Sequence, residues 1–156
     1  MVRVLFVCLG NICRSPMAEA VFRHLVREAG LEDQIEVDSA GIGNWHVGDP
    51  AHRGTREVLA QHNISYDGRA RQVTRADLKR FDYVLAMDYE NLADLRSLAG
   101  SDGQGARIQL FMDYAPQAGT REVPDPYYSG KFDEVYALVR QAAQGLLEHI
   151  REEHGL

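Results

Sequence analysis

The sequence is poor in cysteine, with only Cys8 and Cys13 among its 156 residues. Two cysteines cannot form the disulfide framework of a small secreted protein, and they fit a reducing compartment. Long apolar runs are also missing. The N-terminal segment 4–9 is too short for a membrane-spanning helix or for the apolar part of a signal peptide. We therefore expect a cytoplasmic protein that does not bind a membrane.

Strong positive charge is missing as well. The formal net charge is −6, and no stretch carries five or more like charges in a row, which argues against an extended nucleic-acid surface or a polybasic patch. The Gly-x4-Gly-Lys motif of nucleotide-binding loops does not occur. The histidines show no metal-ligand spacing. We expect no nucleic-acid partner, no metal and no cofactor.

The sequence does contain a regular alternation of strand and helix patterns. Apolar segments typical of buried strands occur at 2–7, 35–40, 83–87 and 108–111. Helices are expected at 17–30, through 58–59 to about 63, at 74–81, from 88 through 95 and at 132–150, with a long loop at 112–129. We predict an α/β fold: a short parallel sheet of about four strands with helices on both faces. We expect a single domain over residues 1–156, and a monomer.

The most informative segment joins the first strand to the first helix. Cys8 follows the strand, Arg14 stands six residues later, and Ser15-Pro16 opens the helix. The backbone N–H groups of such a tight loop and the positive end of the helix face the same point, and that point lies where doubly wound sheets bind their ligands. We predict a loop that binds phosphate or a similarly shaped oxyanion. Its other members are Leu9, Gly10, Asn11, Ile12, Cys13 and Ser15.

Within this loop Cys8 is the predicted nucleophile. A thiol reacts as the thiolate, which the helix dipole, the N–H groups and Arg14 would stabilise, and a Ser15 hydroxyl would add a hydrogen bond. The planar Arg14 guanidinium matches two oxygens of a phosphate. Gly10 and Asn11 suit positive φ. The alternatives are a buried structural cysteine in a strand-to-helix turn and an ion-paired surface arginine.

Asp125 is the predicted general acid. It stands between Pro124 and Pro126, which hold its carboxyl on a stiff segment. A thiolate that attacks a phosphate monoester must expel an alkoxide or phenoxide, and this step needs a proton donor. Taken alone, Asp125 would be a turn residue, because Asp-Pro is ordinary turn chemistry. Its pairing with the Cys8 loop favours the acid.

These motifs resemble the low-molecular-weight protein tyrosine phosphatases, over nearly the whole chain. The segments that carry the resemblance are Val-Cys-x-Gly-Asn-x-Cys-Arg-Ser-Pro at 7–16, Asp-Ser-Ala-Gly at 38–41, Ala-Arg-Gln at 70–72 and Asp-Pro-Tyr-Tyr at 125–128. The resemblance implies that Cys8 takes the phosphoryl group and Asp125 protonates the leaving phenol. Water then cleaves the phosphocysteine, with Asp125 as base and without a metal. Phosphotyrosine-containing proteins would be the partners and inorganic phosphate the product.

The resemblance also implies roles for residues around the loop. Asn11 and Ser39 would form the hydrogen-bonded layer behind it. Trp45 and Tyr127 would wall a cleft deep enough for a phenyl phosphate and too deep for phosphoserine. Trp45 as an ordinary half-buried aromatic residue is the alternative. Tyr128 is placed with the cleft, with packing, exposure to solvent and phosphorylation left open.

Gly68 and Cys13 are the two remaining positions for which the resemblance suggests a role. Animal members often carry a histidine just before Ala-Arg-Gln, where this chain has Gly68, so the loop is expected to depend more on Asn11 and Ser39. Cys13 lies five residues from Cys8 and either traps oxidised Cys8 as a disulfide, a role that the resemblance supports, or fills a small buried space.

Three rival functions remain open. An arsenate reductase shares the loop; thioredoxin-linked versions need further cysteines after Cys13, but one that uses an external thiol does not. A protein-arginine phosphatase tends to carry threonine where Ile12 stands. A non-catalytic thiol redox sensor would use Cys8 and Cys13 but would have no need of Asp125.

Overall fold

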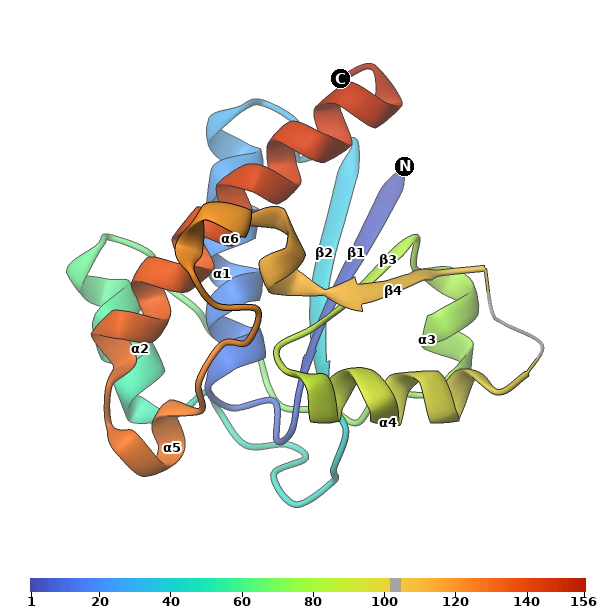
Figure 1. Cartoon of the computed structure of the whole chain (residues 1–156). Coiled ribbons are helices and arrows are strands. Elements are labelled where there is room, and N and C mark those ends of the chain that lie inside the picture. Colours follow the sequence, from blue (N-terminus) through green and yellow to red (C-terminus); the bar gives the residue numbers. More distant parts are fainter. Residues whose placement is uncertain (102–104) are drawn as a thin grey trace.

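The computed structural model describes residues 1–101 and 105–156. A parallel four-stranded sheet forms its centre, with the order β2-β1-β3-β4 (Figure 1). The strands are β1 (Val2–Cys8), β2 (Ile35–Gly41), β3 (Tyr83–Ala86) and β4 (Arg107–Leu110). The predicted α/β class and short parallel sheet are confirmed.

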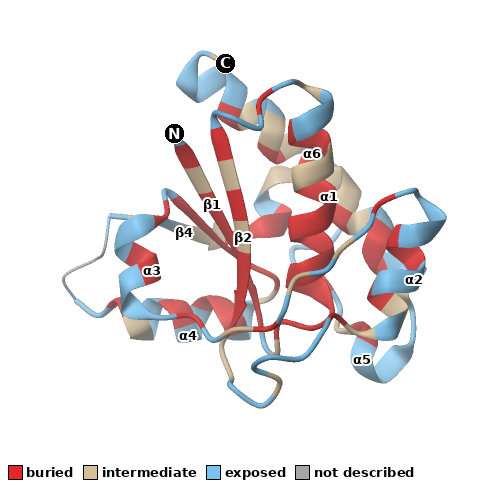
Figure 2. Cartoon of the chain, turned by 180° about the vertical axis from the view of Figure 1, so that it is seen from behind, coloured by how far each residue is buried: buried red, intermediate tan, exposed pale blue. Residues whose placement is uncertain are grey.

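Helices cover both faces of this sheet. They are α1 (Arg14–Glu28), α2 (Arg53–Gln61), α3 (Arg75–Arg80), α4 (Tyr89–Ala99), α5 (Pro126–Ser129) and α6 (Phe132–His154). Helices α1, α2 and α6 lie on one side, and α3 and α4 on the other (Figures 1 and 2). None of the described helices is both long and apolar enough to cross a membrane.

Strand β1 is apolar on both faces because it lies inside the sheet. Val4 and Phe6 point into the core beneath α1 and α6, whereas Leu5 and Val7 point into the core beneath α3 and α4. Figure 2 shows the resulting buried band along the strand. The strand therefore ends in a rigid, fully packed position that fixes Cys8.

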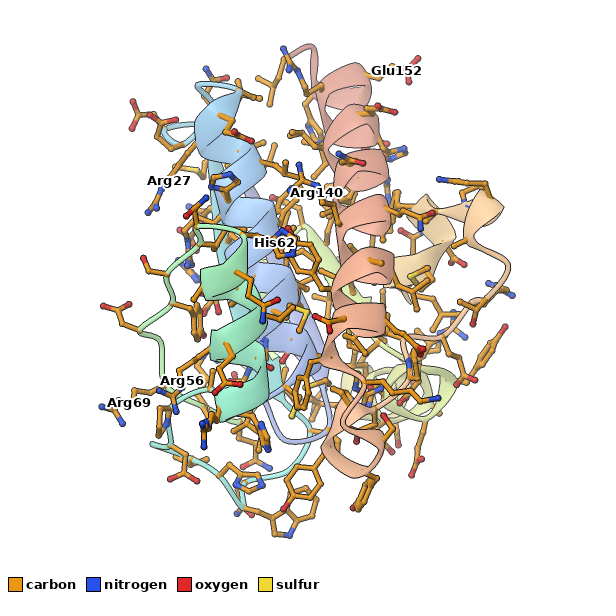
Figure 3. The ribbon with its side chains drawn as sticks, turned by 90° about the vertical axis from the view of Figure 1, so that its left-hand side faces the viewer. Arg27, Arg56, His62, Arg69, Arg140 and Glu152 are labelled. Carbon is orange, nitrogen blue, oxygen red and sulfur yellow. The ribbon has the colours of Figure 1, made fainter. Side chains whose placement is uncertain are left out.

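Aromatic contacts join the helices to the sheet and to one another. The Phe6 ring packs edge-on against the rings of Phe22 and Phe111, with centroids 5.7 and 5.0 Å apart. His62, at the end of α2, stacks on Tyr136 of α6 with ring centroids 3.9 Å apart (Figure 3). These contacts hold α1, α2 and α6 as one layer behind the loop that follows β1.

Several element boundaries differ from the sequence-based expectation. β4 ends at Leu110 because its partner β3 ends at Ala86, and Phe111 begins the 3-10 helix η1 (Phe111–Tyr114). The expected loop at 112–129 also contains the 3-10 helix η2 (Pro116–Ala118) and the single-turn α5. Helix α1 starts at Arg14, three residues before the first residue of its apolar stripe.

Candidate active site

The predicted phosphate loop, residues 8–15, turns its carbonyl oxygens outward. The carbonyls of Cys8 and Leu9 accept hydrogen bonds from the N–H groups of Ile42 and Gly43, at 2.9 Å each. Further round, the Ile12 carbonyl accepts from the His52 N–H at 2.7 Å. Because a peptide N–H points away from its C=O, this pattern leaves the loop N–H groups facing the centre, as an anion site requires.

Asn11 holds the loop in shape from behind. Its φ of 57° lies in the left-handed region, as predicted. Its side-chain Nδ2 donates to Ser15 Oγ at 2.8 Å and to Ser39 Oγ at 2.9 Å, and its Oδ1 accepts from the Arg71 N–H at 3.0 Å. The hydrogen-bonded layer formed by Asn11 and Ser39 is therefore present.

The expectation of positive φ is wrong for Gly10, which is not among the residues with positive φ. A close approach explains the glycine instead, because a Cβ on Gly10 would lie 3.1 Å from His46 Cδ2. Gly41, at the end of β2, is equally confined, since its Cβ would lie 3.0 Å from the Leu9 carbonyl oxygen. The loop is thus pressed between β2 and the segment that carries His46.

Cys8 and Cys13 are both free, buried thiols with different surroundings. Cys8 Sγ lies 3.0 Å from Ser15 Oγ. Ser15 Oγ accepts from Asn11, and its own proton can be donated to Cys8 Sγ or to the Ala40 carbonyl, 3.4 Å away. Cys13 packs against Ile12 and Ala70, and its burial together with the nearby negative charge of Cys8 raises the pKa of Cys13 to about 12.

Arg14 is buried, and its guanidinium is held by hydrogen bonds from Nη1. Nη1 donates to Asp88 Oδ2 at 2.7 Å and to the Val123 carbonyl at 2.9 Å. Burial opposes its charge, but the negative charges of Cys8 and Asp88 prevail and raise the pKa of Arg14. Within residues 1–101 and 105–156, Nε finds no hydrogen-bond partner, and Nη2 lies 3.8 Å from Asp125 Oδ2. This second edge is free to bind two oxygens of an anion.

Asp125 lies opposite Arg14 at the mouth of the site. It is the N-cap of α5, and its Oδ1 accepts from the Tyr127 N–H at 3.0 Å. Pro126 stands at the first position of that helix. The stiff segment predicted from the two prolines is therefore a capped helical turn, which leaves Oδ2 directed toward Arg14.

A cleft of about 230 Å³ opens above the loop. It is lined by Cys8, Leu9, Gly10, Ile12, Cys13, Arg14, Trp45, His46, Asp125, Tyr127 and Tyr128. Trp45 is 69% exposed and lies over Gly43, where any Cβ would collide with its ring. Tyr127 is 51% and Tyr128 84% exposed. The three aromatic residues rise around an opening at whose base Cys8 is almost fully buried.

The chain matches the family described as low molecular weight phosphotyrosine protein phosphatase over residues 3–155. The chain belongs to this family. It is 52% identical over 157 residues to the low molecular weight protein-tyrosine-phosphatase YfkJ of Bacillus subtilis, with 100% of both chains covered. The crystal structure of YfkJ superposes with a TM-score of 0.93 over 98% of this chain and 96% of that one. A Drosophila arginine phosphatase, 35% identical, superposes with a TM-score of 0.89 over 95% and 97%.

Sequence reasoning missed four residues that lie beside or behind the loop: Asp88, His46, Glu19 and Tyr66. Asp88 stands at the start of the helix expected from 88 through 95; it is the N-cap of α4 and also pairs with Arg14. The carboxyl ends of neighbouring parallel strands share one edge, so the position of Asp88 after β3 was a usable signal. His46 in the cleft and the Glu19–Tyr66 pair behind Ser39 gave no signal.

Gly68, the position at which the sequence departs from the animal members, is explained by Tyr66. A Cβ on Gly68 would lie 2.3 Å from the Tyr66 hydroxyl oxygen. The tyrosine ring therefore occupies the space next to residue 68. The loop is expected to depend more on Asn11 and Ser39, and in the structure Tyr66 is joined to Ser39 through Glu19.

Proposed function

We propose that this protein is a protein tyrosine phosphatase that hydrolyses phosphotyrosine, and small aryl phosphates, through a phosphocysteine intermediate. The observation that carries the proposal is the free Nε–Nη2 edge of Arg14, buried beside Cys8 and facing Asp125. Two phosphate oxygens would bind this edge, and the remaining charge would be met by the inward N–H groups of the loop.

In the first step Cys8 Sγ attacks phosphorus, so that the S–P bond forms and the P–O bond to the phenol breaks. Asp125, protonated, gives its proton to the departing phenolate oxygen. Arg14 would hold the equatorial oxygens more firmly as the transferring group flattens in the transition state. Asp88, fixed to the other edge of the guanidinium, keeps that plane in position.

In the second step a water molecule attacks the phosphocysteine, and Asp125, now ionised, takes its proton. The S–P bond breaks, inorganic phosphate leaves, and the Cys8 thiolate is restored. Ser15 is placed to donate a hydrogen bond to the departing thiolate, which would make Cys8 a better leaving group. None of these steps uses a metal or a cofactor.

The walls of the cleft support an aromatic substrate. Trp45 and Tyr127 are exposed and line the cleft above Cys8, a residue that is 3% exposed, so a phenyl ring can bridge the distance that a short serine side chain cannot. Tyr128 extends the wall outward, with its ring centroid 5.1 Å from that of Tyr127. Ile12, apolar at the base of the cleft, favours the aryl ester over phosphoarginine.

We extend the proposal to the organisation of the protein. Residues 1–156 are proposed to act as one phosphatase domain, as a monomer in the cytoplasm, where Cys8 and Cys13 stay reduced. The proposed partners are phosphotyrosine-containing proteins. Trapping of oxidised Cys8 by Cys13 stays a prediction.

The experiment that tests this function compares hydrolysis of 4-nitrophenyl phosphate and a phosphotyrosine peptide with and without EDTA. We expect equal rates in both conditions, no activity for Cys8→Ser, and a rate reduced about 100- to 10,000-fold for Asp125→Ala with little loss of phosphate affinity. A chain inactive on both substrates, or an active Cys8→Ser variant, would overturn the proposal.

Three further measurements separate the rival functions. Phosphoarginine cleaved faster than phosphotyrosine would identify an arginine phosphatase, and arsenate reduced with glutathione as electron donor would identify an arsenate reductase. Phosphotyrosine binding without turnover by the wild type would identify a thiol sensor. We expect none of these three results.

A further inference from the structure

We propose that Tyr66 is a positioning residue for the phosphate loop, which it orders by holding the buried carboxylate of Glu19. The inference rests on the proposed phosphatase function and adds a residue that lies outside the cleft and outside the loop. It concerns the layer behind Asn11 and Ser39, on the side of the sheet covered by α1.

Glu19 lies on α1 and is almost fully buried, with 5% of its surface exposed. A buried carboxylate must be fully hydrogen-bonded to avoid a large desolvation cost. Its Oε1 accepts from Ser39 Oγ at 2.5 Å and from the Tyr66 hydroxyl at 2.8 Å, and its Oε2 accepts from Arg23 Nη2 at 2.6 Å. Tyr66 therefore supplies one of three hydrogen-bond donors to the Glu19 carboxylate, and the loss of any of them would leave a buried charge without one of its partners.

A carboxylate oxygen only accepts, so the Ser39 hydroxyl donates to Glu19 and its oxygen is left to accept from Asn11 Nδ2. The same Nδ2, which only donates, also binds Ser15 Oγ. The Ser15 hydroxyl can then donate to Cys8 Sγ at 3.0 Å or to the Ala40 carbonyl at 3.4 Å. A continuous chain of hydrogen bonds thus runs from Tyr66 to the reactive sulfur.

Tyr66 also decides which way the Glu19 carboxylate is held. Arg23 binds the opposite oxygen, is partly exposed and donates as well to the Val37 carbonyl at 2.8 Å. Without the Tyr66 hydroxyl, attraction to Arg23 would draw the carboxylate away from Ser39. Burial and the charge of Glu19 raise the pKa of Tyr66, so its hydroxyl stays protonated and remains a donor at neutral pH.

Gly68 provides an independent way to disturb the same contact. Its φ is not positive, so alanine is tolerated by the backbone, but the new Cβ would lie 2.3 Å from the Tyr66 hydroxyl oxygen and 2.5 Å from Cζ. The ring must then move away from Glu19. Tyr66→Phe removes the hydroxyl and keeps the ring, whereas Gly68→Ala keeps the hydroxyl and displaces it.

The test measures kcat and KM for 4-nitrophenyl phosphate in Tyr66→Phe, Gly68→Ala and the double variant. We expect kcat to fall about three- to tenfold in each single variant, as for the loss of one hydrogen bond, while KM changes less than about twofold. Since both changes break one contact, the double variant should be no slower than the slower single variant by more than about twofold. Fully multiplicative losses would contradict the proposal.

Tyr114→Phe is the matched control, because it removes a hydroxyl that donates to Gln109, outside the phosphate-loop network. We expect it to lower the melting temperature as much as Tyr66→Phe and to leave kcat unchanged. Equal kcat in Tyr66→Phe, Tyr114→Phe and the wild type would overturn the proposal, and so would a parallel loss of kcat in both variants.

Vanadate binding separates failure of this inference from failure of the proposed function. Vanadate titration, followed through the fluorescence of Trp45, the one tryptophan of the chain, needs no turnover. We expect the vanadate Kd to rise about three- to tenfold in Tyr66→Phe, in step with the fall in kcat. An inactive wild type would end the proposed function, whereas an unchanged Kd in Tyr66→Phe would end the role of Tyr66.

Discussion

At the scale of single residues, two cysteines five positions apart have opposite surroundings. Cys8 lies 3.0 Å from the Ser15 hydroxyl and interacts with the buried Arg14 charge. Cys13 packs against Ile12 and Ala70, and its pKa of about 12 keeps it a neutral thiol. The sequence motif contains both cysteines, and both are buried, so their contacts distinguish the proposed nucleophile from its neighbour.

This difference predicts selective alkylation. At pH 8 Cys13 is expected to stay almost wholly protonated, because burial and the negative charge of Cys8 raise its pKa to about 12. With iodoacetamide we expect Cys8 to be modified at least about tenfold faster than Cys13, as measured by mass spectrometry of digested samples. In urea the two should react alike. Modification of Cys13 first in the folded protein would contradict the assignment.

The residues of the candidate site could be predicted from the sequence only where they form local motifs. Cys8, Arg14 and Ser15 are fixed by a strand-loop-helix segment, and Asp125 is flanked by prolines. Asp88 lies 74 residues from Arg14, and Tyr66 lies 47 residues from Glu19. Such contacts depend on how separate elements pack, and no spacing rule within one segment reports them.

At the scale of elements, the segment 70–73 straps the end of β2 to the phosphate loop. Its Arg71 backbone accepts from the Gly41 N–H at 2.8 Å and donates to Asn11 Oδ1 at 3.0 Å. The Arg71 side chain in turn pairs with Asp38 and Asp77, at 3.0 Å each. Asp77 also closes a capping box with Thr74 at the start of α3.

Asp77 therefore takes part both in the cap of α3 and, through Arg71, in holding the segment 70–73 in place. Burial opposes its charge, but Arg71 and the Thr74 N–H prevail and hold the pKa of Asp77 below its ordinary value. A carboxyl with a lowered pKa stabilises the fold above its unfolded pKa, near 4, and this contribution is lost as the pH falls through the folded pKa.

We predict that Asp77→Asn lowers the free energy of unfolding by about 1–2 kcal/mol at pH 7, because one charge-assisted contact and part of a cap are lost. The gap from the wild type should shrink as the pH falls below about 4. Urea unfolding at pH 7, 4 and 3 measures it. A gap of the same size at all three values would show that the Asp77 charge contributes nothing.

At the scale of the whole molecule, the parallel arrangement of the strands brings the residues of the site together. The ends of β1, β2 and β3 meet at one edge and bring together Cys8, the Ser39–Gly43 segment and Asp88. The alternation of strand and helix patterns predicted this arrangement, because parallel strands need crossover connections. The same patterns did not predict α5 or the 3-10 helices η1 and η2, because such short turns are determined by packing against the core and leave no periodic signal in the sequence.

The charge of the whole molecule does not draw a phosphorylated substrate to the cleft, since the net charge is −6. Attraction must be local, from the buried Arg14, the start of α1 and the inward N–H groups of the loop. Catalysis therefore depends on the local chemistry of the loop, in which we propose that the phosphoryl group passes through Cys8.

Rapid acid quenching of the reaction with 4-nitrophenyl phosphate, followed by digestion and mass spectrometry at low pH, tests this claim most directly. We expect phosphate on the peptide that contains Cys8, attached to Cys8 and not to Cys13, at times before steady-state turnover. Product formation with Cys8 unmodified at every time, or phosphate attached to another side chain, would contradict it.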